Sequence, residues 1–317
     1  MTSGGGHDGS ATSLGWLVVV ALGIVYVVWG STYLAIRVVV EDLPPMASAS
    51  WRYLCGGLIL GALLTARGGL RRLRATPAEL AGTAFLGLML PALGNGVVSV
   101  AEHMGATSGV AALLVASVPL WVIVWRSAAK DRPPRRTFVG VLLGFVGLVV
   151  LLAGAGFGGE IDVVASLLVV FAAMCWSFGS WTTPRLTLPK DPFVIAVYEM
   201  LFGAVFLLIG AAARGEHVLP TAAPLEAWLA WVYLVTFGSV VAFTAYVWLL
   251  SSAPISLVAT YAYVNPVVAV FLGWLILNEV VTASIALGGA IVIGAVAVVV
   301  SGERPARRRS RWATARR

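Results

Sequence analysis

Long apolar runs separated by short polar stretches follow one another along nearly the whole chain. A transmembrane helix rises 1.5 Å per residue and needs about 20 apolar residues to cross the hydrocarbon core of a bilayer. Strands of an outer-membrane barrel alternate apolar and polar residues over about ten positions, and these runs do not. Because hydrocarbon cannot satisfy the free edge of a sheet, each run must be a helix. We predict an all-α membrane protein with ten transmembrane helices, at residues 14–36, 46–66, 79–99, 104–126, 137–154, 162–184, 192–212, 226–249, 254–277 and 282–301.

The composition supports the same class of protein. Hydrophobic residues make up 60% of the chain and charged residues 11%, with a mean hydropathy of +0.95. Soluble domains average about 45–50% apolar and about 25% charged residues. The first apolar run is too long for a secretory signal and has no basic segment before it, so we expect it to remain as the first helix.

The basic residues predict how the chain is oriented. If the N-terminus is cytoplasmic, all 21 Lys and Arg except Arg37, Arg52 and Arg214 lie in cytoplasmic loops, in the tail or at a cytoplasmic helix mouth. This positive-inside pattern predicts a multi-pass inner-membrane protein with both termini in the cytoplasm. Residues 1–13 would form a flexible cytoplasmic N-terminus. We interpret the basic tail, 302–317, as a topology anchor on anionic lipid, and expect no nucleic-acid partner.

Shifting the sequence by 147 residues reveals an internal repeat. Such self-similarity at a fixed spacing indicates duplication. The repeats would be 14–154 and 162–301, and because each holds five helices, the second would be inverted relative to the first. Many secondary transporters place a site at mid-membrane between two inverted repeats. The matched pairs are Trp29 with Trp176, Pro45 with Pro192, Pro77 with Pro224, Glu79 with Glu226, and Pro119 with Pro266.

The predicted helix at 254–277 carries polar groups and a proline in its interior. Tyr261 and Asn265 are four residues apart and share one helix face. Pro266 lacks an amide donor and frees a backbone carbonyl, which is tolerated in a membrane where the backbone lines a cavity or is buried in protein. We therefore orient this face toward a central cavity. The alternative is a kinked helix whose asparagine bonds to a neighbouring helix.

Aromatic and small polar residues share a face on the first helix of each repeat. On the first, Trp29, Thr32 and Tyr33 are spaced for one face. On the second, Trp176 and Ser180 form the equivalent stripe. These stripes are either a cavity wall of rings and hydroxyls, suited to an amphipathic solute, or ordinary core packing. Candidate flex points are Gly30, Pro119, Gly179 and Pro266.

Polar and charged groups inside or near predicted spans are candidates for function. Asn95 lies between two glycines within the third span and is a candidate cavity residue. Glu102 and His103 lie near the outer end of that helix, where they form either a proton-coupling pair or, as we favour, a solvated pair. Arg52 and Glu199 occupy equivalent positions in the two repeats and are candidates for gating or coupling.

The last helix of each repeat is rich in small residues and has no polar site residue. Gly140 and Gly144 form a GxxxG motif, and Gly147 matches Gly294 across the repeat. Small residues let helix backbones approach closely. We expect these two helices to pack against each other as a scaffold.

We find no motif of an enzyme, a cofactor site or a metal site. The chain has no Walker loop, HExxH, DDxxD-type cluster or GxSxG elbow. Its three histidines are too scattered for a metal site, and Cys55 and Cys175 both fall inside spans, where we expect them to be packing residues. We predict a protein that is not an enzyme, with no cofactor.

Four stretches resemble EamA-type members of the drug/metabolite transporter superfamily, and most closely the YedA-like inner-membrane exporters. They are "WGSTYLAIR", "GNGVVSVAEH", "WSFGSWTTPRLTLP" and "ATYAYVNPVVAVFLGWLILNE". The resemblance implies two inverted EamA repeats, with a cavity formed by the first, third, fourth, sixth, eighth and ninth helices. It also implies that the fifth and tenth helices occupy the place of a dimer contact in smaller relatives. Carried over by position, the cavity lining would be Trp29, Thr32, Tyr33, Asn95, Trp176, Ser180, Tyr246, Tyr261 and Asn265.

One feature departs from the resemblance. Smaller relatives couple protons through a carboxylate in the first helix, and this chain has none between Leu14 and Ile36. The favoured hypothesis is a secondary transporter that exports small amphipathic metabolites or drugs by alternating access. The alternatives are an uncoupled facilitator or channel, and a non-transporting membrane scaffold. We expect a monomer that binds a small-molecule solute, with a homodimer as the alternative.

Overall fold

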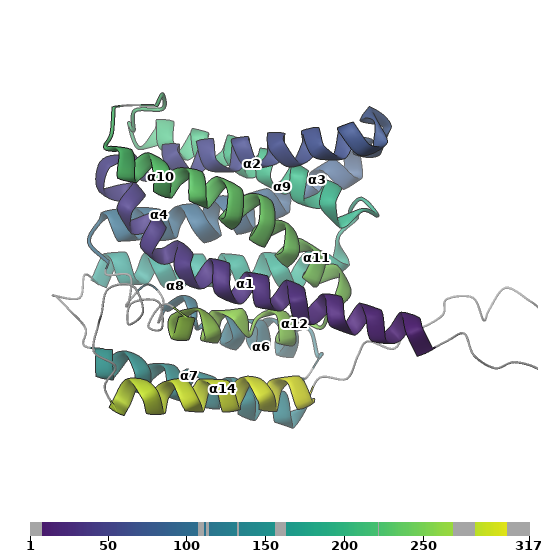
Figure 1. The fold of residues 1–317 in the computed structure, drawn as a ribbon, viewed down its shortest axis with the longest axis vertical. Coiled ribbons are helices and arrows are strands. Elements are labelled where there is room, and N and C mark those ends of the chain that lie inside the picture. Colours follow the sequence, from purple (N-terminus) through teal and green to yellow (C-terminus); the bar gives the residue numbers. More distant parts are fainter. Residues whose placement is uncertain are drawn as a thin grey trace, which may run out of the picture.

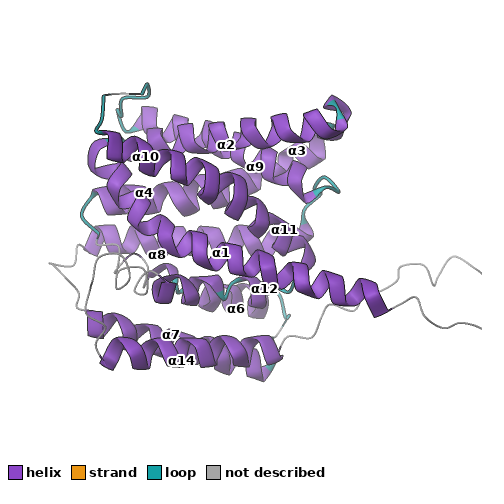
Figure 2. Ribbon diagram, in the orientation of Figure 1, coloured by secondary structure: helices purple, strands orange, loops and turns teal. Residues whose placement is uncertain are grey.

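The computed structural model describes residues 8–106, 111, 114–131, 133–155, 163–220, 222–268 and 283–302, and these residues form helices joined by loops, with no strand (Figure 2). The all-helical prediction is thus confirmed over the described residues. The helices are α1 (Asp8–Asp42), α2 (Pro45–Gly68), α3 (Pro77–Gly87), α4 (Val97–His103), α6 (Val118–Ala128), α7 (Arg135–Ala155), α8 (Val163–Thr182), α9 (Pro192–Ala213), α10 (Leu225–Tyr233), α11 (Thr244–Ser252), α12 (Ile255–Val258) and α14 (Ala283–Gly302), with π-helical η2 (Leu88–Gly96) and η4 (Leu234–Phe243), and short 3-10 turns η1 (Leu70–Leu73) and η3 (Thr183–Arg185).

Six helical stretches among the described residues are long and apolar enough to cross a membrane, and three shorter apolar helices accompany them. Two of the six are compound, because α3, η2 and α4 run on as Pro77–His103, and α10, η4 and α11 as Leu225–Ser252. Parts of the predicted spans 104–126 and 254–277 lie outside the described residues. The count of ten spans therefore stays a prediction. Of the predicted N-terminal segment 1–13, residues 8–13 belong to α1, and residues 1–7 lie outside the described residues. The tail 302–317 lies outside them except for Gly302.

The two repeats have matching elements that run in opposite directions. Helices α2 and α9 begin at the matched prolines Pro45 and Pro192, where the missing amide of proline costs nothing. The π-helical segments η2 and η4 also fall at equivalent places along their compound helices. In Figure 1, the chain from α3 to α4 runs from right to left, whereas the equivalent chain from α10 to α11 runs from left to right. The fold therefore contains the inverted arrangement that the repeat predicted.

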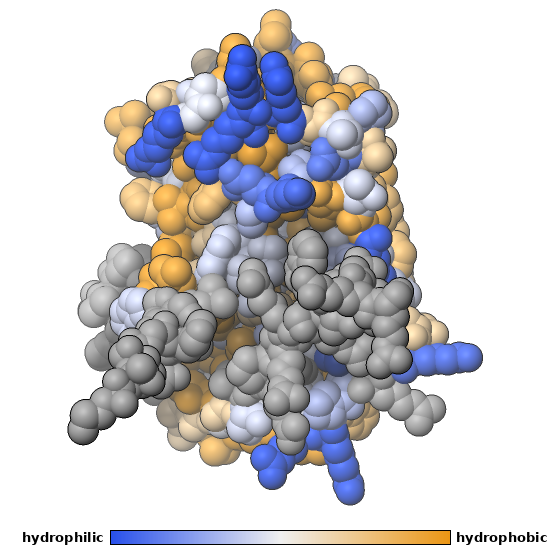
Figure 3. Space-filling model, turned by 90° about the vertical axis from the view of Figure 1, so that its right-hand side faces the viewer, coloured by the Kyte–Doolittle hydropathy of each residue, from blue (hydrophilic) through white to orange (hydrophobic). Residues whose placement is uncertain are grey.

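The bundle has two ends, which we name by the chain termini. The terminal face is the end at which α1 begins and α14 ends, on the right in Figure 1, and the opposite face is the other end. Figure 3 looks onto the terminal face and shows hydrophilic side chains gathered there. Exposed basic residues of the described loops at this face include Arg71, Arg74, Lys130, Arg185 and Lys190.

Large apolar side chains remain exposed along the sides of the bundle, between the two faces. Trp16, Leu167 and Ile293 are each more than half exposed. Exposed apolar surface on this scale is unusual for a soluble monomer and typical of a surface that meets lipid or a partner. Lipid contact accounts for it in helices of this length and hydropathy.

Helices α7 and α14 lie side by side at one edge of the bundle (Figure 1). A Cβ atom added at Gly140 would lie 2.7 Å from the side chain of Val299, and one at Gly147 would lie 2.8 Å from that of Ile291. Small residues thus permit close contact of the two backbones. The predicted packing of these helices is confirmed. A Cβ at Gly294 would meet no atom of the described residues within 4 Å, so this glycine is not part of the described contact.

Two helices are interrupted near the middle of the bundle. Helical structure stops at a turn over Ala116 and Ser117, and α6 begins at Val118 with Pro119 in its first turn. In the second repeat, a turn at Ala259 and Thr260 separates α12 from the helical residues 261–268, which include Pro266. The backbone breaks therefore occur in equivalent helices. Gly30 and Gly179 instead lie inside continuous helices at close contacts, with Val268 and Leu90 respectively.

Candidate functional site

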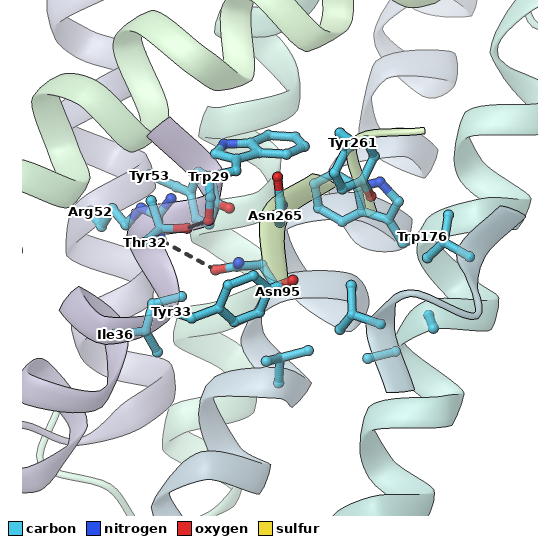
Figure 4. A pocket seen from close by; sticks show the side chains of 16 residues that line it. Trp29, Thr32, Tyr33, Ile36, Arg52, Tyr53, Asn95, Trp176, Tyr261 and Asn265 are labelled. Atoms are coloured by element: carbon cyan, nitrogen blue, oxygen red, sulfur yellow. Dashed lines mark hydrogen bonds between the residues drawn. The ribbon is translucent and has the colours of Figure 1, made fainter. Parts of the chain in front are cut away.

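A cavity of about 60 Å³ lies inside the bundle, between the two repeats (Figure 4). The first repeat supplies walls from α1, α2, η2, α4 and α6, and the second repeat supplies α8 and the helical residues 261–268. The lining combines aromatic rings with a few polar groups, which is the usual character of a small-molecule site. Its residues are Trp29, Thr32, Tyr33, Ile36, Arg52, Tyr53, Gly94, Asn95, Val98, Val115, Val118, Ala172, Ala173, Trp176, Tyr261 and Asn265.

The structure brings together most of the residues that the sequence singled out. Those that line the cavity are Trp29, Thr32, Tyr33, Asn95, Trp176, Tyr261 and Asn265. Ser180 and Tyr246 lie behind this wall, fully buried and bonded to each other. The lining also includes α2 through Arg52 and Tyr53, whereas the resemblance had implied α10–α11 in its place.

An aromatic cluster of Trp29, Trp176, Tyr246 and Tyr261 forms one end of the cavity. The ring centroid of Trp29 lies 5.4 Å from that of Trp176, 4.9 Å from that of Tyr246 and 5.0 Å from that of Tyr261. Edge-on and tilted ring pairs at these distances each contribute about 0.5–1.5 kcal/mol beyond the area that they bury. The cluster joins α1, α8, α11 and the helical residues 261–268, and so it holds the two repeats together.

Hydrogen bonds fix the rings of the aromatic cluster. The hydroxyl of Tyr246 accepts from Trp176 Nε1 at 2.9 Å and shares a hydrogen bond of 2.6 Å with Ser180. Trp29 Nε1 donates to the carbonyl of Gly238 at 3.2 Å. Because buried indole and phenol groups need partners, these bonds select one ring arrangement.

The cavity lies on one side of the aromatic cluster only. Along α1, the lining residues run from Trp29 to Ile36, toward the opposite face. One turn nearer the terminal face, the hydroxyl of Tyr26 is hydrogen-bonded to Thr260. Arg126 on α6 also donates to Ser256 on α12 at 2.6 Å, near the terminal face. The bundle is therefore closed between the cavity and the terminal face.

Asn265 is 1% exposed and serves both roles that the sequence left open. Oriented so that both side-chain atoms are satisfied, its amide nitrogen donates to the carbonyls of Tyr261 at 3.0 Å and Tyr26 at 3.3 Å. The second bond crosses to α1, while the residue also lines the cavity. The choice between a cavity residue and an interhelical bond was thus not exclusive.

Arg52 reaches into the space between the two π-helical segments. Its Nε donates to Ser239 Oγ on η4 at 2.8 Å, and its Nη1 donates to Asn95 Oδ1 on η2 at 3.4 Å. The side chain is 4% exposed, and no carboxylate of the described residues lies within ion-pair distance of it. Sequence reasoning missed Ser239, whose only signal was a hydroxyl within the apolar run of η4.

The acidic candidates are buried rather than solvated. Glu102 is 1% exposed and Glu199 is fully buried, and among the described residues neither carboxyl group has a hydrogen-bond partner. His103, next to Glu102 in sequence, is exposed, and its Nδ1 lies 2.9 Å from the carbonyl oxygen of Val40. The expected solvated pair of Glu102 and His103 is therefore wrong for Glu102, because the last turn of α4 packs into the bundle.

Among the described residues, no group of three or more His, Cys, Asp or Glu side chains is placed to hold a metal ion. Cys55 and Cys175 are free and partly buried.

These features define a class: a multi-pass helical membrane protein built from two inverted repeats around an internal cavity. Comparison with known families makes the assignment specific. The EamA-like transporter family matches the chain twice, at residues 15–153 and 163–301, and the chain belongs to this family.

Individual relatives agree with the family. The chain is 38% identical over 285 residues to an uncharacterized inner membrane transporter, YedA, of Escherichia coli K12. The aligned region covers 89% of this chain and 90% of that protein. It is 26% identical over 287 residues to the uncharacterized transporter YvbV of Bacillus subtilis, covering 88% and 90% of the two chains. A protein crystal structure with 21% identity and a TM-score of 0.72 covers 90% of this chain and 96% of that one, which shows a shared fold.

Proposed function

We propose that this protein is a secondary transporter that exports small amphipathic metabolites or drugs from the cytoplasm by alternating access. The observation that carries the proposal is the cavity between two inverted repeats, closed toward the terminal face by the aromatic cluster. The positive-inside pattern supports assigning the terminal face to the cytoplasm. In this assignment the structure corresponds to a state that is closed to the cytoplasm.

The small volume of the cavity supports a mechanism in which the protein changes conformation to admit its solute. Sites for drug-sized ligands occupy about 300–1,000 Å³, whereas this cavity measures about 60 Å³. A solute of that size enters only if the repeats move apart. Rocking of one repeat against the other is the motion that inverted-repeat transporters use.

Each part of the site has a proposed role. Trp29, Thr32, Tyr33, Asn95, Trp176, Tyr261 and Asn265 contact the solute, and Ser180 with Tyr246 holds the closed aromatic cluster. The buried carboxyl groups of Glu102 and Glu199 are candidates for proton coupling, because a carboxylate buried without a partner is costly and can be relieved by taking up a proton. Pro119 and Pro266 lie in the interrupted helices that would bend.

The test uses purified protein in liposomes. Thermal-shift screening of a metabolite and drug library first identifies a solute, since a ligand of the native state raises its apparent stability. Flux of that solute is then compared among the native chain, Trp29→Ala, Asn265→Ala and the exposed control Trp16→Ala. We expect flux to fall strongly in the two cavity variants only. Unchanged flux in both would overturn the cavity assignment.

The alternative is an uncoupled facilitator. It is favoured by the lack of an acidic residue in the middle of α1. The two are separated by imposing a pH gradient across the liposome. A coupled exporter accumulates solute against its concentration gradient, and a facilitator only equilibrates it.

A further inference from the structure

Arg52 is a buried cation that no carboxylate of the described part of the chain contacts. A guanidinium remains protonated in proteins, and a charge at membrane depth is normally paired or used for function. Its hydrogen-bond partners, Ser239 and Asn95, are both neutral, and so is the ring of Tyr53, whose centroid lies 5.0 Å from the guanidinium carbon. Among the described residues no Asp or Glu compensates its charge at contact distance.

Part of the guanidinium is left over for a ligand. It carries five N–H donors, and the described residues provide acceptors only for Nε and Nη1. Nη2 lies beside Gly238, where an added Cβ would come within 2.9 Å of it. The glycine thus makes room for the cationic head at the side of the cavity that Arg52 lines (Figure 4).

Asn95 adds a second donor at the same place. Its Oδ1 accepts from Arg52, and the amide nitrogen of the same group has no partner among the described residues. Asn95 also lines the cavity. A forked guanidinium beside an amide N–H₂ matches the geometry of a carboxylate.

The remainder of the cavity lining defines the rest of the ligand. Rings of Trp29, Tyr33, Trp176 and Tyr261 form its walls, and they suit an aromatic or apolar body. The described lining contains no Asp or Glu to pair with an ammonium group, and Arg52 is its one cationic residue. A single cation suits a single negative charge better than a phosphate ester or a dianion.

We infer that Arg52 and Asn95 anchor the carboxylate of an amphipathic aromatic monocarboxylate that is the solute of this cavity. The inference rests on the proposed transport function, because it names the class of solute that the cavity would carry. The aromatic cluster covers the body of this solute, and the cavity enlarges to admit it.

The first experiment measures binding to purified protein with a matched set of ligands. These are 3-phenylpropionate, its neutral analogue 3-phenylpropionamide and the cation 3-phenylpropylamine. Concentration-dependent thermal stabilisation and quenching of tryptophan fluorescence report binding. We expect the carboxylate to bind, and the amide and the amine to bind at least about tenfold more weakly. The reason is that both lose the charge-assisted hydrogen bond to the guanidinium. Equal binding of acid and amide overturns the inference.

The second experiment changes the anchor. Arg52→Gln should remove the preference for the carboxylate. The control Arg37→Gln, which loses a partly exposed ion pair with Glu41 away from the cavity lining, should keep it. Asn95→Asp places a carboxylate against Arg52 with almost no change in shape, and it should abolish anion binding without loss of thermal stability. This variant keeps the test decisive if Arg52→Gln does not fold. Retained carboxylate preference in Asn95→Asp contradicts the anchor.

The binding assay does not depend on transport. Selective carboxylate binding without flux in liposomes would uphold the anchor and reject the transport proposal. Flux of uncharged solutes that is insensitive to Asn95→Asp, with no carboxylate preference, would reject the anchor and leave transport standing.

Discussion

At the scale of single residues, the hydroxyl of Tyr246 is the point on which the closed aromatic cluster depends. It serves both Trp176 Nε1 and Ser180 in a buried setting. Removing it leaves a buried indole N–H without an acceptor, and such losses cost about 1–3 kcal/mol. Ring packing alone would not restore the same arrangement.

Tyr246→Phe should therefore lower the apparent melting temperature and loosen the cluster. Tyr53→Phe is a matched control, because Tyr53 is equally buried and its hydroxyl forms no hydrogen bond with the described residues. Differential scanning fluorimetry in detergent provides the measurement. An equal effect of the two substitutions would show that the Tyr246 hydrogen bonds do not hold the cluster.

Glu199 differs from its repeat equivalent, Arg52, in what surrounds it. Ser239 and Asn95 hold Arg52. Shifted by the repeat spacing of 147 residues, these two positions become Ala92 and Ala242, which offer no side-chain hydrogen bond. The sequence asymmetry thus accounts for a buried carboxyl group that has no hydrogen-bond partner within the described structure.

Glu199→Gln should uncouple transport from a pH gradient while it preserves exchange of solute across the membrane. The reason is that the amide has nearly the shape of the acid but cannot carry a proton. The measurement is solute accumulation in liposomes with and without an imposed gradient, with exposed Glu226→Gln as the control. Full gradient-driven accumulation by Glu199→Gln would exclude this residue as the coupling group.

At the scale of elements, the contact between α7 and α14 gives the clearest test of packing. At Gly140, any side chain meets Val299 and the backbone of α14. At Gly294, the same side chain meets nothing within 4 Å. The two glycines of this helix pair should therefore respond in opposite ways to substitution by a larger residue.

Gly140→Leu should destabilise the protein by about 1–3 kcal/mol, the usual cost of overpacking, whereas Gly294→Leu should change little. Thermal unfolding of both variants in the same detergent measures the difference. A loss of stability in Gly294→Leu as large as in Gly140→Leu would mean that the outer face of α14 is covered, for instance by a second copy of the chain.

The elements differ in how far sequence could predict them. Apolar runs predicted the helices because burial in lipid demands about 20 such residues, and matched prolines predicted the repeat. The π-helical segments could not be predicted, since Pro91 marks the first and η4 contains no proline. The pairing of Arg52 with Ser239 joins residues 187 positions apart and depends on how α2 meets η4.

The candidate site was predictable in part for the same reason. Helical spacing placed Trp29, Thr32 and Tyr33 on one face, and Tyr261 with Asn265 on another. Small residues such as Gly94 and Ala173 carry no signal of their own, yet they line the cavity. The burial of Glu102 depends on tertiary packing at the end of α4, which local sequence does not encode.

At the scale of the whole molecule, the two inverted repeats meet at the cavity, and the aromatic cluster closes it on one side. Contacts nearer the terminal face, such as that of Arg126 with Ser256, reinforce this closure. Transport requires that these contacts open while the opposite face closes. Thr32, which lines the cavity and is 6% exposed, reports which side is open.

The most direct test labels Thr32→Cys in a chain in which Cys55 and Cys175 are replaced by alanine. A membrane-impermeant thiol reagent is added to one side or the other of oriented liposomes, with and without a bifunctional thiol cross-link between Arg126→Cys and Ser256→Cys. Alternating access predicts labelling from both sides without the cross-link, and from the opposite face alone with it. Labelling from neither side, or labelling from the terminal face that persists after cross-linking, would contradict alternating access through this cavity.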